Sequence, residues 1–99
     1  MSVHSCSRAA SIGSLNLLEY LRHKNCPWNY WTTTEAAANG HMHILEWAYS
    51  RGCPLESYAL IDAVNNNHDD IIRWLLEHDC PIDDTVLYVL QNAKYKKVI

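Results

Sequence analysis

The dipeptides Cys26-Pro27, Cys53-Pro54 and Cys80-Pro81 stand at two equal intervals of 27 residues. An interval of this size, kept twice in so short a chain, is typical of a repeat array. Proline biases the preceding residue away from the α-helical region of backbone space. We therefore expect the chain to leave one helix at each cysteine, and we interpret each Cys-Pro as the bend between two repeats.

The sequence aligns with itself at the same offset well beyond this dipeptide. Matched pairs are Ala36 with Ala63, Asn39 with Asn66, His41 with His68, Ile44 with Ile71 and Trp47 with Trp74. The 99 residues thus divide into four units, 1–25, 26–52, 53–79 and 80–99, which we expect to form a single domain over 1–99.

Each unit has the pattern of two helices. In the second unit, Asn29 can cap a helix over about 30–39, and Gly40 suits the left-handed residue that ends it. A second helix is predicted over about 41–51, because its apolar residues are spaced for one helix face. Short loops make consecutive helices antiparallel neighbours. We predict an all-α solenoid of stacked antiparallel helix-turn-helix repeats, roughly three and a half of them.

The same pattern predicts how the repeats are joined. Gly52 ends the second helix of its unit, and Asn25 and Asp79 stand at the matching positions, where all three residue types tolerate a left-handed conformation. An apolar residue follows each Cys-Pro, and we expect these three side chains to fold back on the repeat: Trp28, Leu55 and Ile82.

The segment Ala-Ala-Ala-Asn-Gly-His-Met-His-Ile-Leu-Glu-Trp, residues 36–47, resembles an ankyrin repeat, in which an Ala-Ala-x-x-Gly-His-Leu pattern joins the two helices. The resemblance extends over the whole chain and is faintest in the fourth unit, where Lys94 and Tyr95 replace glycine and histidine. An ankyrin repeat has about 33 residues and carries a β-hairpin finger. The Cys-Pro link takes the finger's place here, as in the short repeats of giant DNA viruses and oomycetes, to which this chain is similar.

The resemblance implies a non-catalytic scaffold or adaptor that binds a protein through its first helices, which line the concave face of such stacks. It also implies a structural role for His41 and His68, through hydrogen bonds at the turn. Aromatic side chains are favoured at binding hot spots. The candidate protein-binding residues are Trp31, Thr34, Glu35, Tyr58, Ile61 and Asp62. Three further tryptophans are expected to pack in the core or between repeats: Trp28, Trp47 and Trp74.

Composition argues against other classes. A formal net charge of −3 and the lack of a basic face argue against nucleic-acid binding. The sequence has no apolar run of the ~20 residues that a membrane helix needs. The first residues lack the pattern of a signal peptide. We expect an intracellular, cytoplasmic protein, in the host cytoplasm if it is viral, with reduced cysteines.

The cysteine, histidine and acidic residues do not have the spacing of a metal site or the motif of a catalytic site. Cys26, Cys53 and Cys80 belong to successive repeats, and stacked helices lie about 8–10 Å apart, too far to share one zinc ion or a disulfide. Ser57, His68 and Asp62 have the residue types of a hydrolytic triad, but no nucleophile motif accompanies them. We expect no catalytic residue, no metal and no cofactor.

Two alternatives stay open. The chain ends at Val98-Ile99, about five residues into the last predicted helix. A helix of this length is too short to be stable alone. One alternative is a complete short protein with Lys94–Lys97 as a polar cap, a self-assembling unit that forms a homo-oligomer through its C-terminal repeat face. The other is a piece of a longer array.

Overall fold

The computed structural model describes residues 2–91, and this part of the chain forms seven helices and no strand. The helices are α1 (Val3–Ile12), α2 (Leu15–His23), α3 (Tyr30–Ala38), α4 (Met42–Ser50), α5 (Ser57–Asn65), α6 (Asp69–Glu77) and α7 (Asp84–Gln91). The all-helical prediction is therefore confirmed. The fourth unit's second helix, the Lys94 and Tyr95 positions and the C-terminal repeat face lie outside the described residues.

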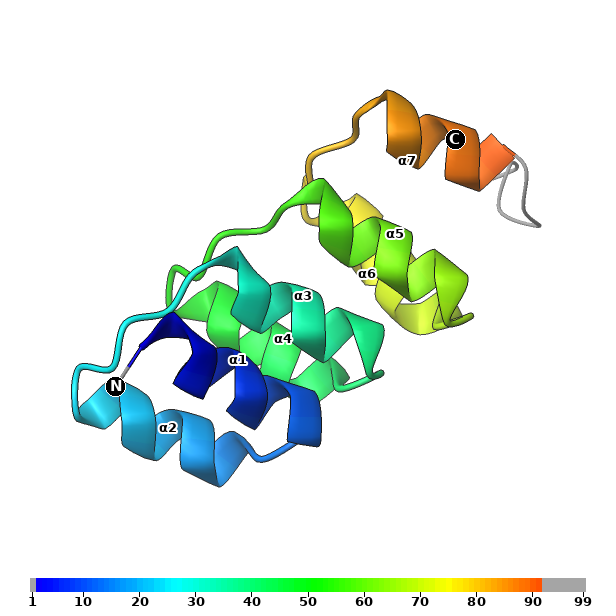
Figure 1. Ribbon diagram of the computed structural model, residues 1–99. Coiled ribbons are helices and arrows are strands. Elements are labelled where there is room, and N and C mark those ends of the chain that lie inside the picture. The colour runs from blue at the N-terminus through cyan, green and yellow to red at the C-terminus, as the bar shows by residue number, and fades with distance from the viewer. Residues whose placement is uncertain (1, 92–99) are drawn as a thin grey trace.

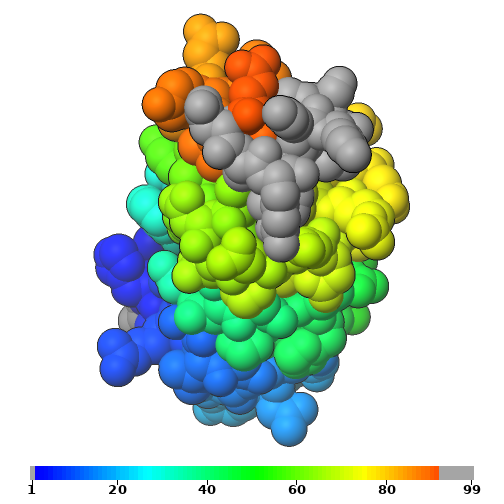
Figure 2. Space-filling model, turned by 90° about the vertical axis from the view of Figure 1, so that its right-hand side faces the viewer, coloured from blue at the N-terminus to red at the C-terminus, as the bar shows by residue number. Residues whose placement is uncertain are grey.

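The helices form a stack of hairpins (Figure 1). The first helices pack on one another in the order α1, α3, α5 and α7, and α2, α4 and α6 each pack on the first helix of their own hairpin. Figure 2 shows the units as successive layers from one end of the molecule to the other. The molecule measures 42 × 19 × 19 Å. This is the elongated form expected of a solenoid, in which each unit contacts only its neighbours.

The turn inside each hairpin has a left-handed residue, and in the second and third hairpins a histidine follows it. Gly13, Gly40 and Asn67 have φ of 80°, 77° and 61°, as predicted. Nε2 of His41 lies 3.1 Å from the carbonyl oxygen of Ser11, and Nε2 of His68 lies 3.0 Å from that of Ala38. Each histidine thus joins its own turn to the end of the first helix in the preceding unit. The structural role implied for both histidines is confirmed.

The bend between hairpins is also built in one repeated way. Asn25, Gly52 and Asp79 have φ of 63°, 88° and 58°, which confirms the predicted left-handed ends of the second helices. The next residue is the cysteine, and its N–H donates to a carbonyl in the last turn of that helix; for Cys53 the acceptor is Ala48, at 3.0 Å. Proline then has no N–H to satisfy, so the helix cannot resume there.

The thiol of each bend cysteine closes the hairpin that precedes it. Sγ of Cys26, Cys53 and Cys80 lies 3.4, 3.2 and 3.3 Å from a carbonyl oxygen in the residue that caps the first helix of that hairpin. These cap residues are Ser2, Asn29 and Glu56. Burial raises the pKa of the Cys53 and Cys80 thiols to about 12, so both stay protonated and can donate. The cysteines link the two ends of a hairpin.

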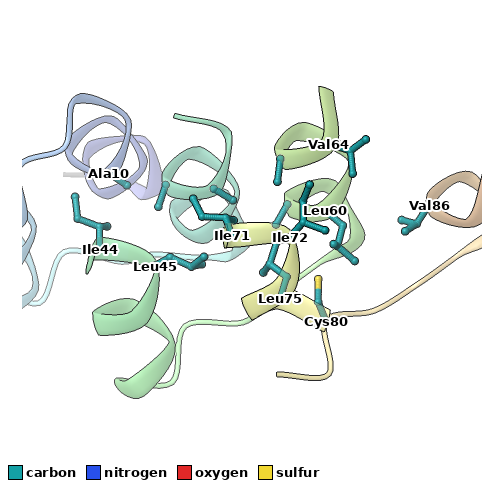
Figure 3. Close-up of a cluster of buried hydrophobic side chains, with 14 of the residues drawn as sticks. Ala10, Ile44, Leu45, Leu60, Val64, Ile71, Ile72, Leu75, Cys80 and Val86 are labelled. Carbon is teal, nitrogen blue, oxygen red and sulfur yellow. The ribbon is translucent and has the colours of Figure 1, made fainter. Parts of the chain in front are cut away.

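The core is a continuous apolar layer between the two rows of helices (Figure 3). Its largest fully buried side chains include Leu18, Ile44, Leu45, Leu60, Ile71 and Leu75. Trp28 and Leu55 pack against this layer, as do Trp47 and Trp74, which confirms the packing role predicted for them.

The same prediction is wrong for Ile82, whose side chain is 46% exposed. Trp28 is covered by Trp47 from the second helix of its own unit, at 5.9 Å between ring centroids. In the fourth unit the described residues end at 91, within the unit's first helix. No described helix of the same unit therefore covers Ile82.

Candidate functional site

The exposed side of the first helices carries an aromatic stack. Trp31 lies in the first turn of α3, which Asn29 starts by accepting a hydrogen bond from the N–H of Trp31 at 2.9 Å. Tyr58 occupies the matching position of α5, 27 residues later. The two rings lie 5.9 Å apart at 14° to each other, and Tyr30 stacks on Tyr58 at 5.8 Å. The repeat thus places two large aromatic rings side by side on neighbouring helices.

The structure brings five of the six candidate residues to this side of the stack. Trp31 is 38% exposed and Tyr58 50% exposed, while Glu35, Ile61 and Asp62 are half-buried. We call Trp31, Glu35, Tyr58, Ile61 and Asp62 the first-helix face.

The prediction that Thr34 binds a partner is wrong. Its side chain is fully buried, so it has no surface to offer a partner. The reason is its place on α3: the residue that matches Thr34 in the next unit is Ile61, an apolar side chain at a position that faces partly inward.

The threonine run in α3 has a structural role that the sequence did not reveal. Thr32, Thr33 and Thr34 are all buried. Oγ1 of Thr33 lies 2.8 Å from the carbonyl oxygen of Pro54 and 2.9 Å from that of Tyr30, so its single proton can serve either acceptor. Thr33 thereby fixes α3 to the next Cys-Pro bend. No pattern in the sequence marks this contact, because it joins a helix to a loop 21 residues away.

Two carboxylates lie next to the aromatic stack. Glu35 and Asp62 follow Trp31 and Tyr58 by four residues, which is one helical turn, so they lie on the same side of their helices. Asn39 Nδ2 donates to Oε2 of Glu35 at 3.4 Å and holds this side chain in place. Burial and the negative charge of Glu35 raise the pKa of Asp62 above its ordinary value. The face therefore holds two neighbouring acids that repel when both are ionised.

We expect Asp62→Asn to stabilise the protein at neutral pH. Because the pKa of Asp62 is raised on folding, its contribution to stability is complete below the unfolded pKa and is lost as pH rises through the folded pKa. The neutral amide of asparagine does not ionise, so the variant keeps this stability at pH 7. The gain in free energy of unfolding should be less than about 1 kcal/mol, because solvent screens the site. Urea denaturation at pH 4 and pH 7 measures the effect, with Glu46→Gln on the exposed side of α4 as the control. A lower stability of Asp62→Asn at pH 7 would contradict this prediction.

The second helices carry a different pattern, in which one aromatic ring of each helix is paired with a basic residue four positions later. Lys24 Nζ lies 5.8 Å from the Tyr20 ring centroid, the Arg51 guanidinium lies 5.1 Å from that of Trp47, and the His78 ring stacks on Trp74 at 4.0 Å. Sequence reasoning missed these pairs, although the spacing of aromatic and basic residues at 27-residue intervals could have shown them. A hollow of about 410 Å³ lies on this side, lined by Glu19, Arg22, His23, Trp47 and Arg51.

The three residues with triad chemistry have other partners. Ser57 Oγ donates to Asp83 Oδ2 at 3.0 Å, and Nε2 of His68 is engaged with the carbonyl oxygen of Ala38. Asp62 faces Glu35 on the exposed side of the first helices. The fold therefore gives Ser57 and His68 structural contacts.

Among the described residues, no group of three or more histidine, cysteine or acidic side chains could hold a metal ion. No helix in residues 2–91 is long and apolar enough to cross a membrane.

Comparison with known proteins identifies the repeat. Residues 56–86 match the family model of the ankyrin repeat. This segment covers α5, α6 and the start of α7. The hairpin before it repeats its turn, its histidine contact and its bend at the 27-residue offset, and the first hairpin repeats the turn and the bend. No curated protein and no solved structure matches the chain. Ankyrin repeats are protein-interaction modules and are typically non-catalytic. Residues 56–86 therefore carry an ankyrin repeat, and the hairpins that precede them are built in a similar way.

Proposed function

We propose that this protein is a non-catalytic scaffold or adaptor, a single domain over residues 1–99 that binds a protein partner through its first-helix face. The observation that carries the proposal is the stacked, exposed pair Trp31 and Tyr58 on adjacent helices. A monomeric fold gains nothing from leaving two large rings in water, since their apolar area would stabilise it if buried.

The stack has the properties of a binding hot spot. Tryptophan and tyrosine are enriched among the residues that carry binding energy, and they lose little conformational entropy on binding. Trp31 and Tyr58 are held by regular helices and by each other, so the face is formed before a partner arrives. Preorganisation lowers the cost of association. The ankyrin repeat matched in residues 56–86 supports the same function.

The test is a pull-down from cell extract with the double variant Trp31→Ala/Tyr58→Ala. Truncating hot-spot residues costs about 2 kcal/mol or more each, so capture should fall at least tenfold. The matched control is Tyr20→Ala, an exposed aromatic residue on the second-helix side, 57% exposed. Capture should be unchanged by Tyr20→Ala. If the double variant retains every partner, the first-helix face is not the binding surface.

Self-assembly is a second candidate, favoured by the exposed apolar side chains of the last described unit. Ile82 is 46% exposed, and Leu87 on α7 is 37% exposed. Light scattering of the purified chain over a wide concentration range tests this candidate. Association should weaken in the double variant Ile82→Ser/Leu87→Ser, and a strictly monomeric wild-type protein at high concentration would exclude it.

A further inference from the structure

Aromatic rings on the two sides of the stack have neighbouring side chains of opposite charge. On the second-helix side, Tyr20 and Trp47 each carry a lysine or arginine of the same chain, and the Arg22 guanidinium lies 4.2 Å from the ring centroid of Trp28. Within residues 2–91, no such cation lies over Trp31 or Tyr58. The residue one turn after each of these two rings is an acid instead of a base.

This composition defines what the face can attract. An aromatic ring has a negative face, and a cation over it gains about 0.5–2 kcal/mol. Glu35 and Asp62 add negative charge beside the rings, one turn along their helices. Four groups of one electrostatic sign are thus gathered on α3 and α5. A lysine or arginine side chain satisfies both kinds of group at once, whereas a phosphate or a carboxylate would be repelled.

The raised pKa of Asp62 agrees with this assignment. Burial and Glu35 oppose its ionisation in the free protein. A cation placed between the two carboxylates offsets their repulsion, so its binding gains energy that the free protein lacks.

The first unit limits the negatively charged area of α3 and α5 on one side. The residues that match Trp31 and Glu35 on α1 are His4 and Arg8, which are basic and exposed. Both line a hollow of about 480 Å³ that also reaches Glu35. A basic partner would be disfavoured over α1, so the negative area is confined to α3 and α5.

We propose that the partner presents a lysine- or arginine-bearing segment, which lies across α3 and α5 with its cation over Trp31 and Tyr58 and between Glu35 and Asp62. This proposal rests on the proposed function, because it names the chemistry of the partner that the first-helix face binds. It adds that the carboxylates contribute to binding beside the rings.

The experiment selects binders from a phage-displayed library of random 12-residue peptides on the wild-type protein. Selected peptides should be enriched in lysine and arginine. The double variant Glu35→Gln/Asp62→Asn should weaken their binding about tenfold at low salt, since it removes both charges and keeps the shape of the side chains. Binding to the wild type should also weaken between 50 and 200 mM salt. The charge-matched control is Glu46→Gln/Glu77→Gln, two exposed acids on second helices, which should leave binding unchanged.

The outcomes separate this proposal from the one on which it rests. If Trp31→Ala/Tyr58→Ala abolishes binding and Glu35→Gln/Asp62→Asn does not, the face binds a partner but the basic segment is wrong. If neither variant changes binding, both proposals fail. Peptides without an excess of basic residues, a library that yields no binder, or an equal loss in the control variant each overturn the basic segment. The basic segment is also overturned if the wild-type protein self-associates and Glu35→Gln/Asp62→Asn abolishes this association. The first-helix face would then bind a second copy of this chain.

Discussion

Gly13→Ala is expected to lower the free energy of unfolding by about 2–5 kcal/mol. The residue has φ of 80°, where a side chain costs roughly 1–2 kcal/mol. A Cβ at this position would also lie 2.7 Å from Cε1 of His41. The ring cannot yield freely, because its Nε2 is held by the carbonyl oxygen of Ser11. Overpacking of this kind costs about 1–3 kcal/mol. Chemical denaturation followed by circular dichroism measures the change.

Gly52→Ala is the matched control, and it separates the two costs. Gly52 has a similar φ of 88°, but a Cβ there would meet no atom within 4 Å. Only the conformational cost of roughly 1–2 kcal/mol should remain. Gly40→Ala, whose Cβ would lie 3.0 Å from Cε1 of His68, should fall between the two. Equal losses for Gly13→Ala and Gly52→Ala would show that the histidine contact does not constrain the turn.

Leu60→Ala should cost about 2–5 kcal/mol, the range for a large buried side chain that leaves a cavity. Leu60 is fully buried on α5, at the centre of the core layer in Figure 3. A domain of this size is stable by about 5–15 kcal/mol, so the variant loses much of its total stability. In a solenoid, each interface is a nearest-neighbour term. Because Leu60→Ala weakens the packing between neighbouring units, these units should unfold less cooperatively. The thermal transition should therefore also broaden.

Leu17→Ala serves as the control for Leu60→Ala. Leu17 lies on α2 and is 40% exposed, so the same truncation removes less buried area and should cost under about 1 kcal/mol. Differential scanning calorimetry of the two variants compares both the melting temperature and the width of the transition. Similar losses in the two variants would contradict the placement of the core between the two rows of helices.

The repeated features were predictable because local sequence determines them. Gly40 and Asn67 tolerate a left-handed turn, Asn29 is a helix cap, and the bend at Cys53-Pro54 follows from the missing N–H of proline. Each of these requires knowledge of a few neighbouring residues only. The 27-residue period then transfers the result from one unit to the next. The order of the stack follows from the short connections.

Contacts between repeats were less predictable. The sequence predicted that Cys53 lies at a bend between two repeats, but it did not show that the thiol reaches the carbonyl oxygen of Asn29. The burial of Thr34 was missed because threonine side chains are mostly exposed in proteins. The mutual effect of Glu35 and Asp62 depends on the packing of α3 on α5, which a single helix pattern does not contain. The residue types on the first-helix face were predicted; their exposure and electrostatics required the structure.

The central claim is that a protein partner binds on the first-helix side of the stack. Hydrogen–deuterium exchange of the chain, with and without a captured partner, tests this claim most directly. We predict slower exchange in peptides that cover α3 and α5, at residues 30–38 and 57–65, and unchanged exchange in those that cover α4 and α6, at 42–50 and 69–77. Slower exchange confined to α4 and α6 would contradict the account.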